Sequence, residues 1–279
     1  MKQRLFLSTV CRQEAEFADM EMLTNIFDTH AHYDDSSFDD DRDFLLNDLP
    51  HRGVCGIINC GTDLASSSAS IALSAKYSYL YAAVGIHPEL AKDVPQDYLE
   101  QLEKLITEKK VVAVGEIGLD YHFEDNAPKD VQKTIFEHQI LLAKKYNLPI
   151  IVHDRDAHGD TMEILHRLKP MGVMHCFSGS VEMAQEVLRL GMYIGLGGAV
   201  TFKNARVSVE VAAAVPPERL LLETDCPYMT PIPFRGSRND SAMIAYTAEK
   251  IAEVRGTTVE ELLKLTRGNA ERLFGLSTQ

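Results

Sequence analysis

The chain has 279 residues, of which 45% are hydrophobic and 25% are charged. This is the composition of a globular protein that can bury a core without disulfides or a structural metal. Its 41 acidic and 28 basic residues leave a formal net charge of −13. Proteins that grip long nucleic acids present a basic face, so the charge argues against that class and leaves a short single-stranded end or a small molecule as a substrate.

The cysteines and the leading residues indicate where the protein works. Five cysteines, an odd number without a C-x-x-C pair, point to reduced thiols and a cytoplasmic protein. No apolar stretch reaches the roughly 18 residues of a membrane helix, so we expect no membrane partner. Residues 1–24 carry Glu14, Glu16 and Asp19 and lack the apolar core of a secretory signal. We expect them to be a poorly ordered extension, and residues 25–279 to form one domain, as a monomer.

From Asn25 onward, short apolar runs alternate with amphipathic segments. The apolar runs are continuous, as in strands covered on both faces, and they predict strands over Ile26–His30, Val54–Asn59, Tyr79–Ile86, Val111–Ile117, Pro149–His153, Gly172–Cys176, Met192–Gly195 and Leu220–Thr224. Apolar residues three and four positions apart predict helices over Asp39–Asp48, Leu64–Lys76, Gln96–Glu108, Asp130–Tyr146, Thr161–Leu168, Val181–Leu190, Ala205–Ala214 and Asp240–Arg255. Two further helical segments, Val259–Leu265 and Asn269–Phe274, are expected to pack on the outside.

About eight strand–helix units in succession predict an α/β fold, a (β/α)₈ TIM barrel. The alternative is an open doubly wound sheet. Its nucleotide-binding fingerprint is absent, because Gly195-Leu196-Gly197-Gly198 departs from G-x-G-x-x-G and no early strand carries a glycine-rich turn. In a barrel, the carboxyl ends of the strands converge on one face. Polar residues at those ends are therefore the candidates for a functional site.

The first strand ends in a pair of histidines. His30 and His32 are two residues apart, so in an extended strand both imidazoles face the same side and can reach one cation. Neutral imidazole together with carboxylate suits Zn²⁺, Mn²⁺ or a related divalent ion. Taken alone, the pair is also compatible with two histidines in an exposed turn.

Glu116 is the most informative carboxylate of the chain. It lies within the apolar run Val111–Asp120, where burying it without a partner would be costly. A cation is the simplest counter-charge, because the strand offers no Arg or Lys beside it. A carboxylate at this position could bridge two metals.

Three further strand ends carry potential metal ligands. His153 follows the fifth strand, His175 follows the sixth and Asp225 follows the eighth. Each residue alone is compatible with an ordinary core histidine or a structural carboxylate, but their equivalent positions favour ligation. Four histidines and two carboxylates can fill two adjacent divalent sites and leave positions for water and substrate.

Other polar residues are candidates for the substrate side. Arg155, two residues beyond His153, offers a planar guanidinium that matches phosphate oxygens. His87 either contacts substrate or caps a turn. Asp120, Tyr121 and His122 are expected to line the rim, and Arg235, Arg238, Lys203 and Asn239 lie in loops on the same face.

Seven segments together resemble the TatD family of metal-dependent deoxyribonucleases, and the resemblance extends from about Phe27 to Leu276. Each motif alone is weak, but their order and spacing are specific. The segments are Asp28-Thr-His-Ala-His32, Gly85-Ile-His-Pro88, Gly115-Glu-Ile-Gly-Leu-Asp120, His153-Asp-Arg-Asp-Ala157, His175-Cys-Phe-Ser-Gly179, Glu223-Thr-Asp225 with Pro227-Tyr228, and Arg235-Gly236.

The resemblance implies a metallo-dependent hydrolase barrel that cleaves phosphodiester bonds, such as those at DNA ends, with a water activated by two divalent metals (Zn, Mg or Mn). It implies that His30, His32, Glu116, His153, His175 and Asp225 are the metal ligands. We expect His30, His32 and Asp225 to hold one metal and His153 and His175 the other, with Glu116 between them. Glu116 and Asp225 would be catalytic, and His87 and Arg155 would bind the phosphate.

Two departures from the family pattern concern the last loop. Phe234 stands where similar proteins often have His or Tyr, and Asn239-Asp240-Ser241 replaces an Asn-Glu-Pro. They affect expected substrate contacts and leave the metal ligands untouched. Two alternatives stay open: a deacylase or amidohydrolase acting on a small or tRNA-linked ester or amide, and a metal-binding interaction protein without turnover.

Overall fold

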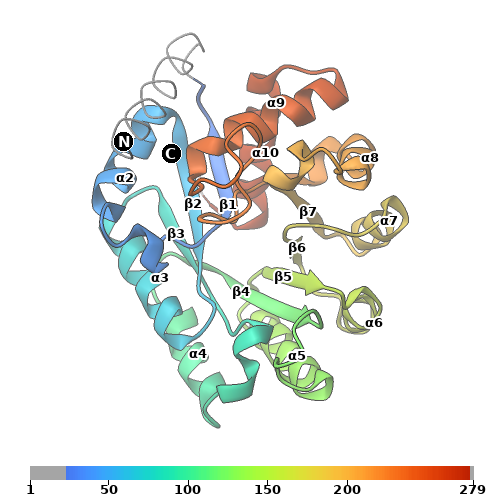
Figure 1. Cartoon of the computed structure of the whole chain (residues 1–279). Helices are drawn as coiled ribbons and strands as arrows, with labels where there is room; N and C mark the ends of the chain where they lie inside the picture. The colour runs from blue at the N-terminus through green and yellow to red at the C-terminus, as the bar shows by residue number, and fades with distance from the viewer. Residues whose placement is uncertain (1–22, 277–279) are drawn as a thin grey trace.

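The computed structural model describes residues 23–276, so most of the predicted N-terminal extension lies outside the described residues. The strands form one eight-stranded parallel sheet in the order β1 to β8 (Figure 1). Their bounds are β1 Ile26–Ala31, β2 Val54–Cys60, β3 Leu80–Val84, β4 Val111–Asp120, β5 Ile150–Arg155, β6 Gly172–Met174, β7 Tyr193–Leu196 and β8 Leu220–Leu222.

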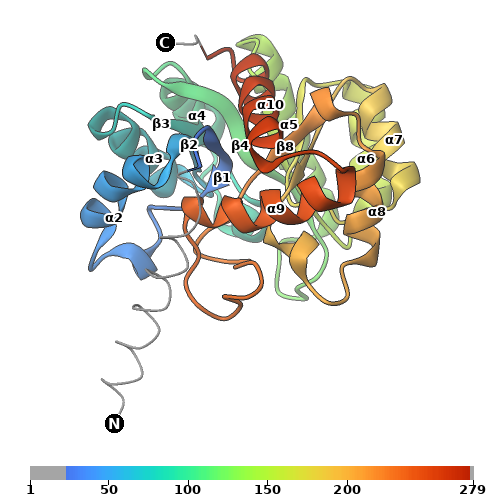
Figure 2. The ribbon, with the colours of Figure 1, turned by 90° about the horizontal axis from the view of Figure 1, so that it is seen from above.

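Helices surround this sheet (Figures 1 and 2). The α-helices are α2 Arg42–Asp48, α3 Leu64–Lys76, α4 Tyr98–Ile106, α5 Lys129–Lys145, α6 His158–Leu168, α7 Val181–Arg189, α8 Arg206–Ala214, α9 Ile244–Arg255 and α10 Val259–Leu273. Short 3₁₀ helices are η1 Ser36–Phe38, η2 Leu49–Arg52, η3 Pro88–Asp93, η4 Gly198–Thr201, η5 Pro217–Arg219 and η6 Ser241–Met243. Among the described residues, no helix is long and apolar enough to cross a bilayer.

The predicted TIM barrel is confirmed, with differences at the element ends. β4 continues to Asp120, three residues beyond its expected end. β6 and β8 are only three residues long, so His175 and Asp225 lie just past the regular strands. The two expected tail segments form one continuous helix, α10, because Gly268 on an open face does not interrupt it.

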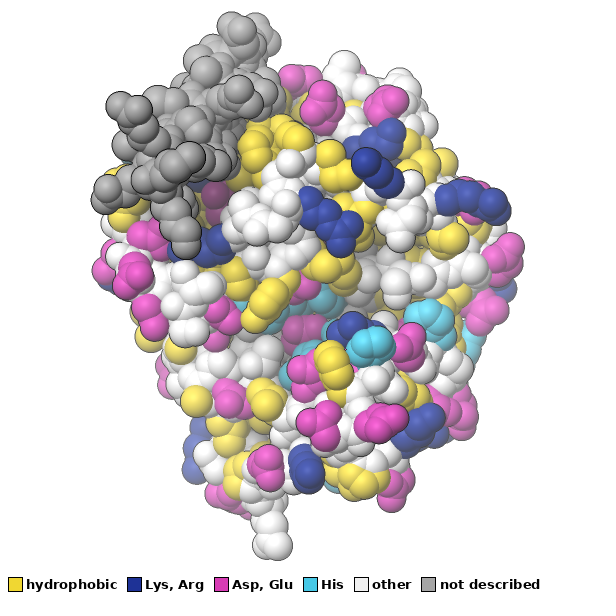
Figure 3. All heavy atoms as spheres, in the orientation of Figure 1, with side chains coloured by type: hydrophobic (Ala, Val, Ile, Leu, Met, Phe, Trp, Pro, Cys, Tyr) yellow, Lys and Arg dark blue, Asp and Glu magenta, His cyan; other side chains and the backbone are white. Residues whose placement is uncertain are grey.

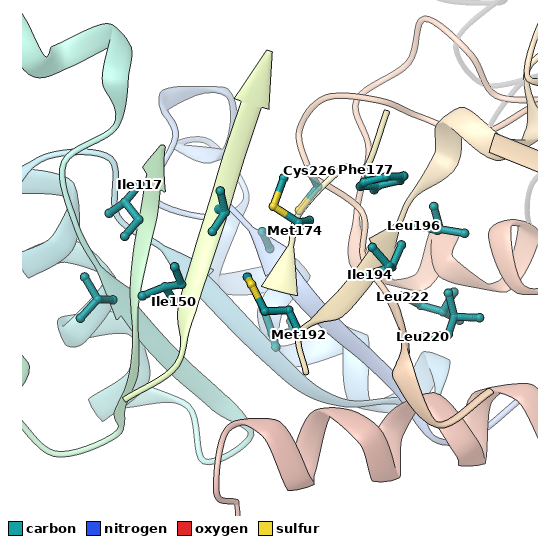
Figure 4. Packing of buried hydrophobic residues seen from close by; sticks show 14 of the residues in the cluster. Ile117, Ile150, Met174, Phe177, Met192, Ile194, Leu196, Leu220, Leu222 and Cys226 are labelled. Atoms are coloured by element: carbon teal, nitrogen blue, oxygen red, sulfur yellow. The ribbon is translucent and has the colours of Figure 1, made fainter. Parts of the chain in front are cut away.

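Two apolar layers lie on opposite sides of the sheet. One residue or more from every strand forms the barrel interior, and α10 adds Ala270, Leu273 and Phe274 to it. The expectation that the tail packs on the outside holds for its first part, since Leu262 and Leu263 belong to the outer layer, but the second part of α10 covers the end of the barrel away from the strand-end loops (Figure 2). The neighbouring strand positions form the second layer beneath the helices, seen around Met174 and Ile194 in Figure 4. This arrangement follows from the two-residue alternation of strands.

Backbone hydrogen bonds close the barrel between its first and last strands at the carboxyl end. The amide of Asp225 donates to the carbonyl of His30 (2.9 Å), and the amide of His32 donates to the carbonyl of Cys226 (2.8 Å). Closure therefore takes place directly at three of the predicted metal ligands.

A buried carboxylate, Asp28, reinforces this closure. It accepts hydrogen bonds from the Thr224 amide (3.0 Å), the Thr224 hydroxyl (2.5 Å) and the Ser241 hydroxyl (2.7 Å). The backbone amide of His30 donates to it at 3.2 Å. The carboxylate thus joins β1 to the segment after β8 and to η6, three segments far apart in sequence.

We expect Asp28→Ala to lower the free energy of unfolding by about 3 kcal/mol, because it leaves several buried donors without acceptors. The measurement is urea denaturation with chelator present, so that metal binding does not contribute. Asp40→Ala, at an exposed acidic position, is the control and should change stability by no more than about 0.5 kcal/mol. Equal stability of the two variants would contradict this role.

Candidate metal centre

The structure brings all six predicted ligands together at the carboxyl ends of the strands. In Figure 3, cyan and magenta side chains gather at the centre of this face. Strand alternation explains part of the convergence. Ile151 and Val173 belong to the barrel interior, so His153 and His175, two residues further along, point the same way. β1 and β4 instead show register shifts near His30 and Glu116, and such irregularities re-aim side chains beside functional sites.

Glu116 lies at the centre of the cluster and is 4% exposed. Its Oε2 lies 3.2 Å from Nε2 of His30 and 3.5 Å from Nε2 of His32. Its Oε1 lies 3.0 Å from Nδ1 of His153 and 3.5 Å from Nε2 of His175. The two oxygens of one carboxylate therefore face two different histidine pairs, the arrangement that a bridging ligand requires.

Asp225 follows β8 and reaches the cluster from beside β1, where the first and last strands meet. Its Oδ1 lies 3.5 Å from Nε2 of His32, 3.8 Å from Nε2 of His30 and 3.9 Å from Nε2 of His175. Its backbone is left-handed (φ 58°), a conformation that Asp tolerates better than most residues. The carboxylate thereby reaches both histidine sets, although it belongs more closely to the His30 and His32 pair.

Hydrogen bonds decide which nitrogen of each ring faces the cluster. Nδ1 of His32 donates to the carbonyl of Cys60 (2.9 Å), and Nε2 of His153 donates to Oδ2 of Asp120 (2.9 Å). The other nitrogen of each ring faces Glu116 and would present its lone pair to a bound metal once its proton is lost. Such partners fix the tautomer of a ligating histidine. Asp120 is fully buried in this role, so the prediction that it lines the rim is wrong.

Glu223 is a site residue that sequence reasoning did not assign. It is 1% exposed, and its Oε1 lies 3.3 Å from Nδ1 of His175 and accepts a hydrogen bond from the Cys176 amide. Gly195 on β7 makes room for it, because a Cβ there would lie 2.5 Å from Oε2 of Glu223. Its spacing of two residues from Leu221 was the available signal, since alternation turns both inward.

The charges of the cluster depend on one another. Burial opposes the charge of Glu116, but His30, His87 and His175 hold its pKa well below the ordinary value. Burial likewise opposes protonation of His32, yet Asp225 and Glu116 raise its pKa to about 9. Without metals, a proton on His32 therefore partly balances the buried carboxylates.

The donor set fits divalent cations. Three sets place their ligand atoms within 4.8 Å of one another: His30, His32 and Glu116; His30, His175 and Asp225; and His87, Glu116 and His153. Nitrogen and carboxylate oxygen donors are those of Zn²⁺ or Mn²⁺ sites. The Nε2 atoms of His30 and His32, 3.0 Å apart, point at the same carboxylate oxygen, as ligands of one ion do.

His87 caps a turn, one of the two roles that its position left open. Its Nδ1 accepts a hydrogen bond from the Glu89 amide (3.2 Å) and so caps η3. The proton of the neutral ring is then on Nε2, which lies 3.5 Å from Oε1 of Glu116. A ring in this tautomer is a hydrogen-bond donor at the cluster and is poorly suited to ligate a metal.

The cluster forms the floor of a cleft of about 690 Å³. Arg155 is the only Lys or Arg among the described residues that line it. The other loop arginines are engaged elsewhere: Arg238 pairs with Asp41, and Arg235 lies over the Phe202 ring. Asn239 is buried and donates to the carbonyls of Thr224 and Tyr228.

Comparisons with known proteins agree with this geometry. The family model described as "TatD related DNase" matches residues 27–275. The chain belongs to the TatD family. This TatD-family chain is 44% identical over 255 residues to the uncharacterized metal-dependent hydrolase YabD of Bacillus subtilis, covering 90% of this chain and all of YabD.

Two further relatives extend the TatD-family comparison. The chain is 32% identical to the 3′-5′ ssDNA/RNA exonuclease TatD of Pantoea ananatis, over 90% of this chain and 100% of that protein. The crystal structure of YjjV, a TatD homologue from Escherichia coli, superposes with a TM-score of 0.86 at 34% identity, covering 92% of this chain and all of YjjV. The chain is thus a metal-dependent hydrolase of the TatD family.

We expect Glu116→Ala to lower the affinity for Zn²⁺ and Mn²⁺ by at least about 10-fold, because it removes the oxygens that face both histidine pairs. Metal content after equilibrium dialysis is the measurement, and circular dichroism checks the fold. Glu124→Ala, an exposed glutamate in the loop after β4, should retain the metal content of the unmodified protein. Unchanged metal content in Glu116→Ala would refute the central position of this carboxylate.

Proposed function

We propose that this protein is a metal-dependent deoxyribonuclease that hydrolyses phosphodiester bonds at the ends of single strands. The observation that carries the proposal is the position of Glu116, whose two oxygens face separate histidine pairs at the floor of an accessible cleft. Paired divalent ions suit phosphoryl chemistry, because they can hold both the attacking and the leaving oxygen. The Pantoea ananatis relative, a 3′-5′ ssDNA/RNA exonuclease, supports the choice of substrate.

In this proposal His30, His32 and Asp225 hold one metal, His153 and His175 hold the other, and Glu116 lies between them. Zn, Mg and Mn are the candidates. When bound, such a pair polarises the phosphate and lowers the pKa of a bound water. The distances from Glu116 support this assignment, since its Oε2 faces His30 and His32 and its Oε1 faces His153 and His175.

The remaining steps belong to side chains of the cleft. The Asp225 carboxylate, 20% exposed, would accept a proton from the attacking water. The Arg155 guanidinium would contact phosphate oxygens as a planar donor. Nε2–H of His87 would donate to the same phosphate, and its tautomer supports this role. Each group is pre-positioned by its own contacts, which lowers the cost of binding.

The charges that line the cleft favour the end of a nucleic-acid strand as the substrate. Asp34, Asp35 and Glu89 line it together with a single guanidinium, that of Arg155. A long polyanion would meet these carboxylates, whereas one terminal phosphodiester can be held by the metals and Arg155 alone. The overall charge of −13 points the same way.

We expect the protein to shorten a single-stranded DNA 20-mer in the presence of Mg²⁺, Mn²⁺ or Zn²⁺, and chelator to abolish the reaction. Asp225→Asn should lower kcat by about 100-fold or more, because an amide cannot accept the proton. Gel analysis of end-labelled DNA and RNA measures both effects. Product from an aminoacyl ester but from neither nucleic acid would favour the deacylase alternative, and no product from any substrate would favour a metal-binding protein without turnover.

A further inference from the structure

Exposed apolar side chains are concentrated at the mouth of the cleft. The large hydrophobic residues that are exposed within residues 23–276 are Phe44, Leu90, Phe123, Val131, Leu141, Met171, Val207 and Tyr228. Three of these eight, Leu90, Phe123 and Tyr228, line the metal cleft. Because exposed apolar surface at a cleft marks a ligand-binding surface, the choice of ligand depends on what surrounds these residues.

Phe123 belongs to a loop that hydrogen bonds hold in place. The Tyr121 amide donates to the carbonyl of Arg155 (2.9 Å), and the His122 amide donates to Oδ1 of Asp120 (2.9 Å). The His122 ring packs edge-on against Phe123, with ring centroids 4.9 Å apart. The phenylalanine ring is thus 43% exposed while its backbone is anchored to the metal centre through Asp120.

Arg155 lies beside this ring. Its guanidinium carbon is 5.0 Å from the Phe123 ring centroid, and no carboxylate among the described residues forms an ion pair with it. An aromatic ring next to a free cation is the combination with which proteins hold single-stranded nucleic acid, stacking on the base and contacting the phosphate.

The opposite wall of the cleft carries the opposite charge. Asp35 follows β1, and Arg155 ends β5, four strands away in the eight-stranded barrel. Asp35 accepts a hydrogen bond from the Tyr228 hydroxyl (3.1 Å), and Glu89 also lines the cleft. On the β5 side Asp154 also lines the cleft, but its carboxylate is buried against His158 (2.7 Å), so Arg155 is the group there that attracts a phosphate, whereas Asp35 and Glu89 repel it.

We propose that Phe123, together with Arg155, forms a stacking subsite for the nucleobase next to the scissile phosphate, and that the strand leaves the cleft on the β4–β5 side. This inference rests on the proposed nuclease function and adds the base as a recognised part of the substrate. In this proposal Phe123 contacts the substrate and takes no part in metal binding. Its ring lies against His122 and Arg155, which are not among the six predicted ligands.

The test compares Phe123→Ala with Phe44→Ala, a matched control because Phe44 on α2 is 76% exposed and does not line the cleft. The substrates are a single-stranded DNA 10-mer and a 10-mer of equal charge whose three terminal residues at each end are abasic. Stacking of one base is lost on alanine substitution, so Phe123→Ala should lower kcat/KM on the normal strand by about 5- to 100-fold. It should leave kcat/KM on the abasic strand within about twofold of the unmodified protein, as Phe44→Ala does on both strands.

Arg155→Gln separates the base contact from the phosphate contact. Because both strands carry the same phosphates, this variant should lower kcat/KM on both. Metal content and circular dichroism of Phe123→Ala should equal those of the unmodified protein. An equal loss on both strands, or no loss on the normal strand, would overturn the stacking subsite.

A binding measurement keeps the subsite testable if the proposed function fails. Asp225→Asn and Asp225→Asn/Phe123→Ala are titrated with fluorescein-labelled strands in the presence of Mn²⁺. Weaker binding of the normal strand by the double variant, with equal binding of the abasic strand, supports the subsite. Absence of product from the unmodified protein refutes the nuclease proposal alone, whereas equal binding by both variants, or no binding at all, refutes the subsite.

Discussion

The structure depends on the burial of one carboxylate, Glu116, in an otherwise apolar strand. A charge at that depth is costly unless opposite charge surrounds it. Five histidines do so, four of them predicted ligands and the fifth His87. Against the effect of burial, the carboxylates raise the pKa of His32, His153 and His175, whereas burial lowers that of His30, so in the metal-free centre protons on some of the histidines occupy positions suited to cations.

The barrel provides that network through its geometry. In β5, β6 and β8, an apolar residue of the barrel interior is followed two positions later by a polar residue that also faces inward. The end of α10 closes the apolar interior on the side away from these polar residues. The seam between β1 and β8 is closed at His30 and Asp225 themselves, and Asp28 holds that seam together. Fold stability and ligand position are therefore coupled at the same backbone segments.

A second set of residues decides what the centre can do. Asp120, Glu223 and the Cys60 carbonyl orient three of the imidazoles, and η3 sets the tautomer of His87. Above them, Asp34, Asp35 and Glu89 line the cleft, and Arg155 beside Phe123 is its one basic side chain among the described residues. In the proposed function this cation would give direction to an anionic substrate.

Local sequence patterns determined the eight strand–helix units and the six ligand candidates, because strand ends in a parallel barrel converge whatever their separation in the chain. His153 and His175 could be placed from alternation alone. The role of Asp120 and the burial of Glu223 against Gly195 required the tertiary structure. Those depend on register shifts in β1 and β4 and on contacts between residues tens of positions apart, and no short-range pattern encodes such contacts.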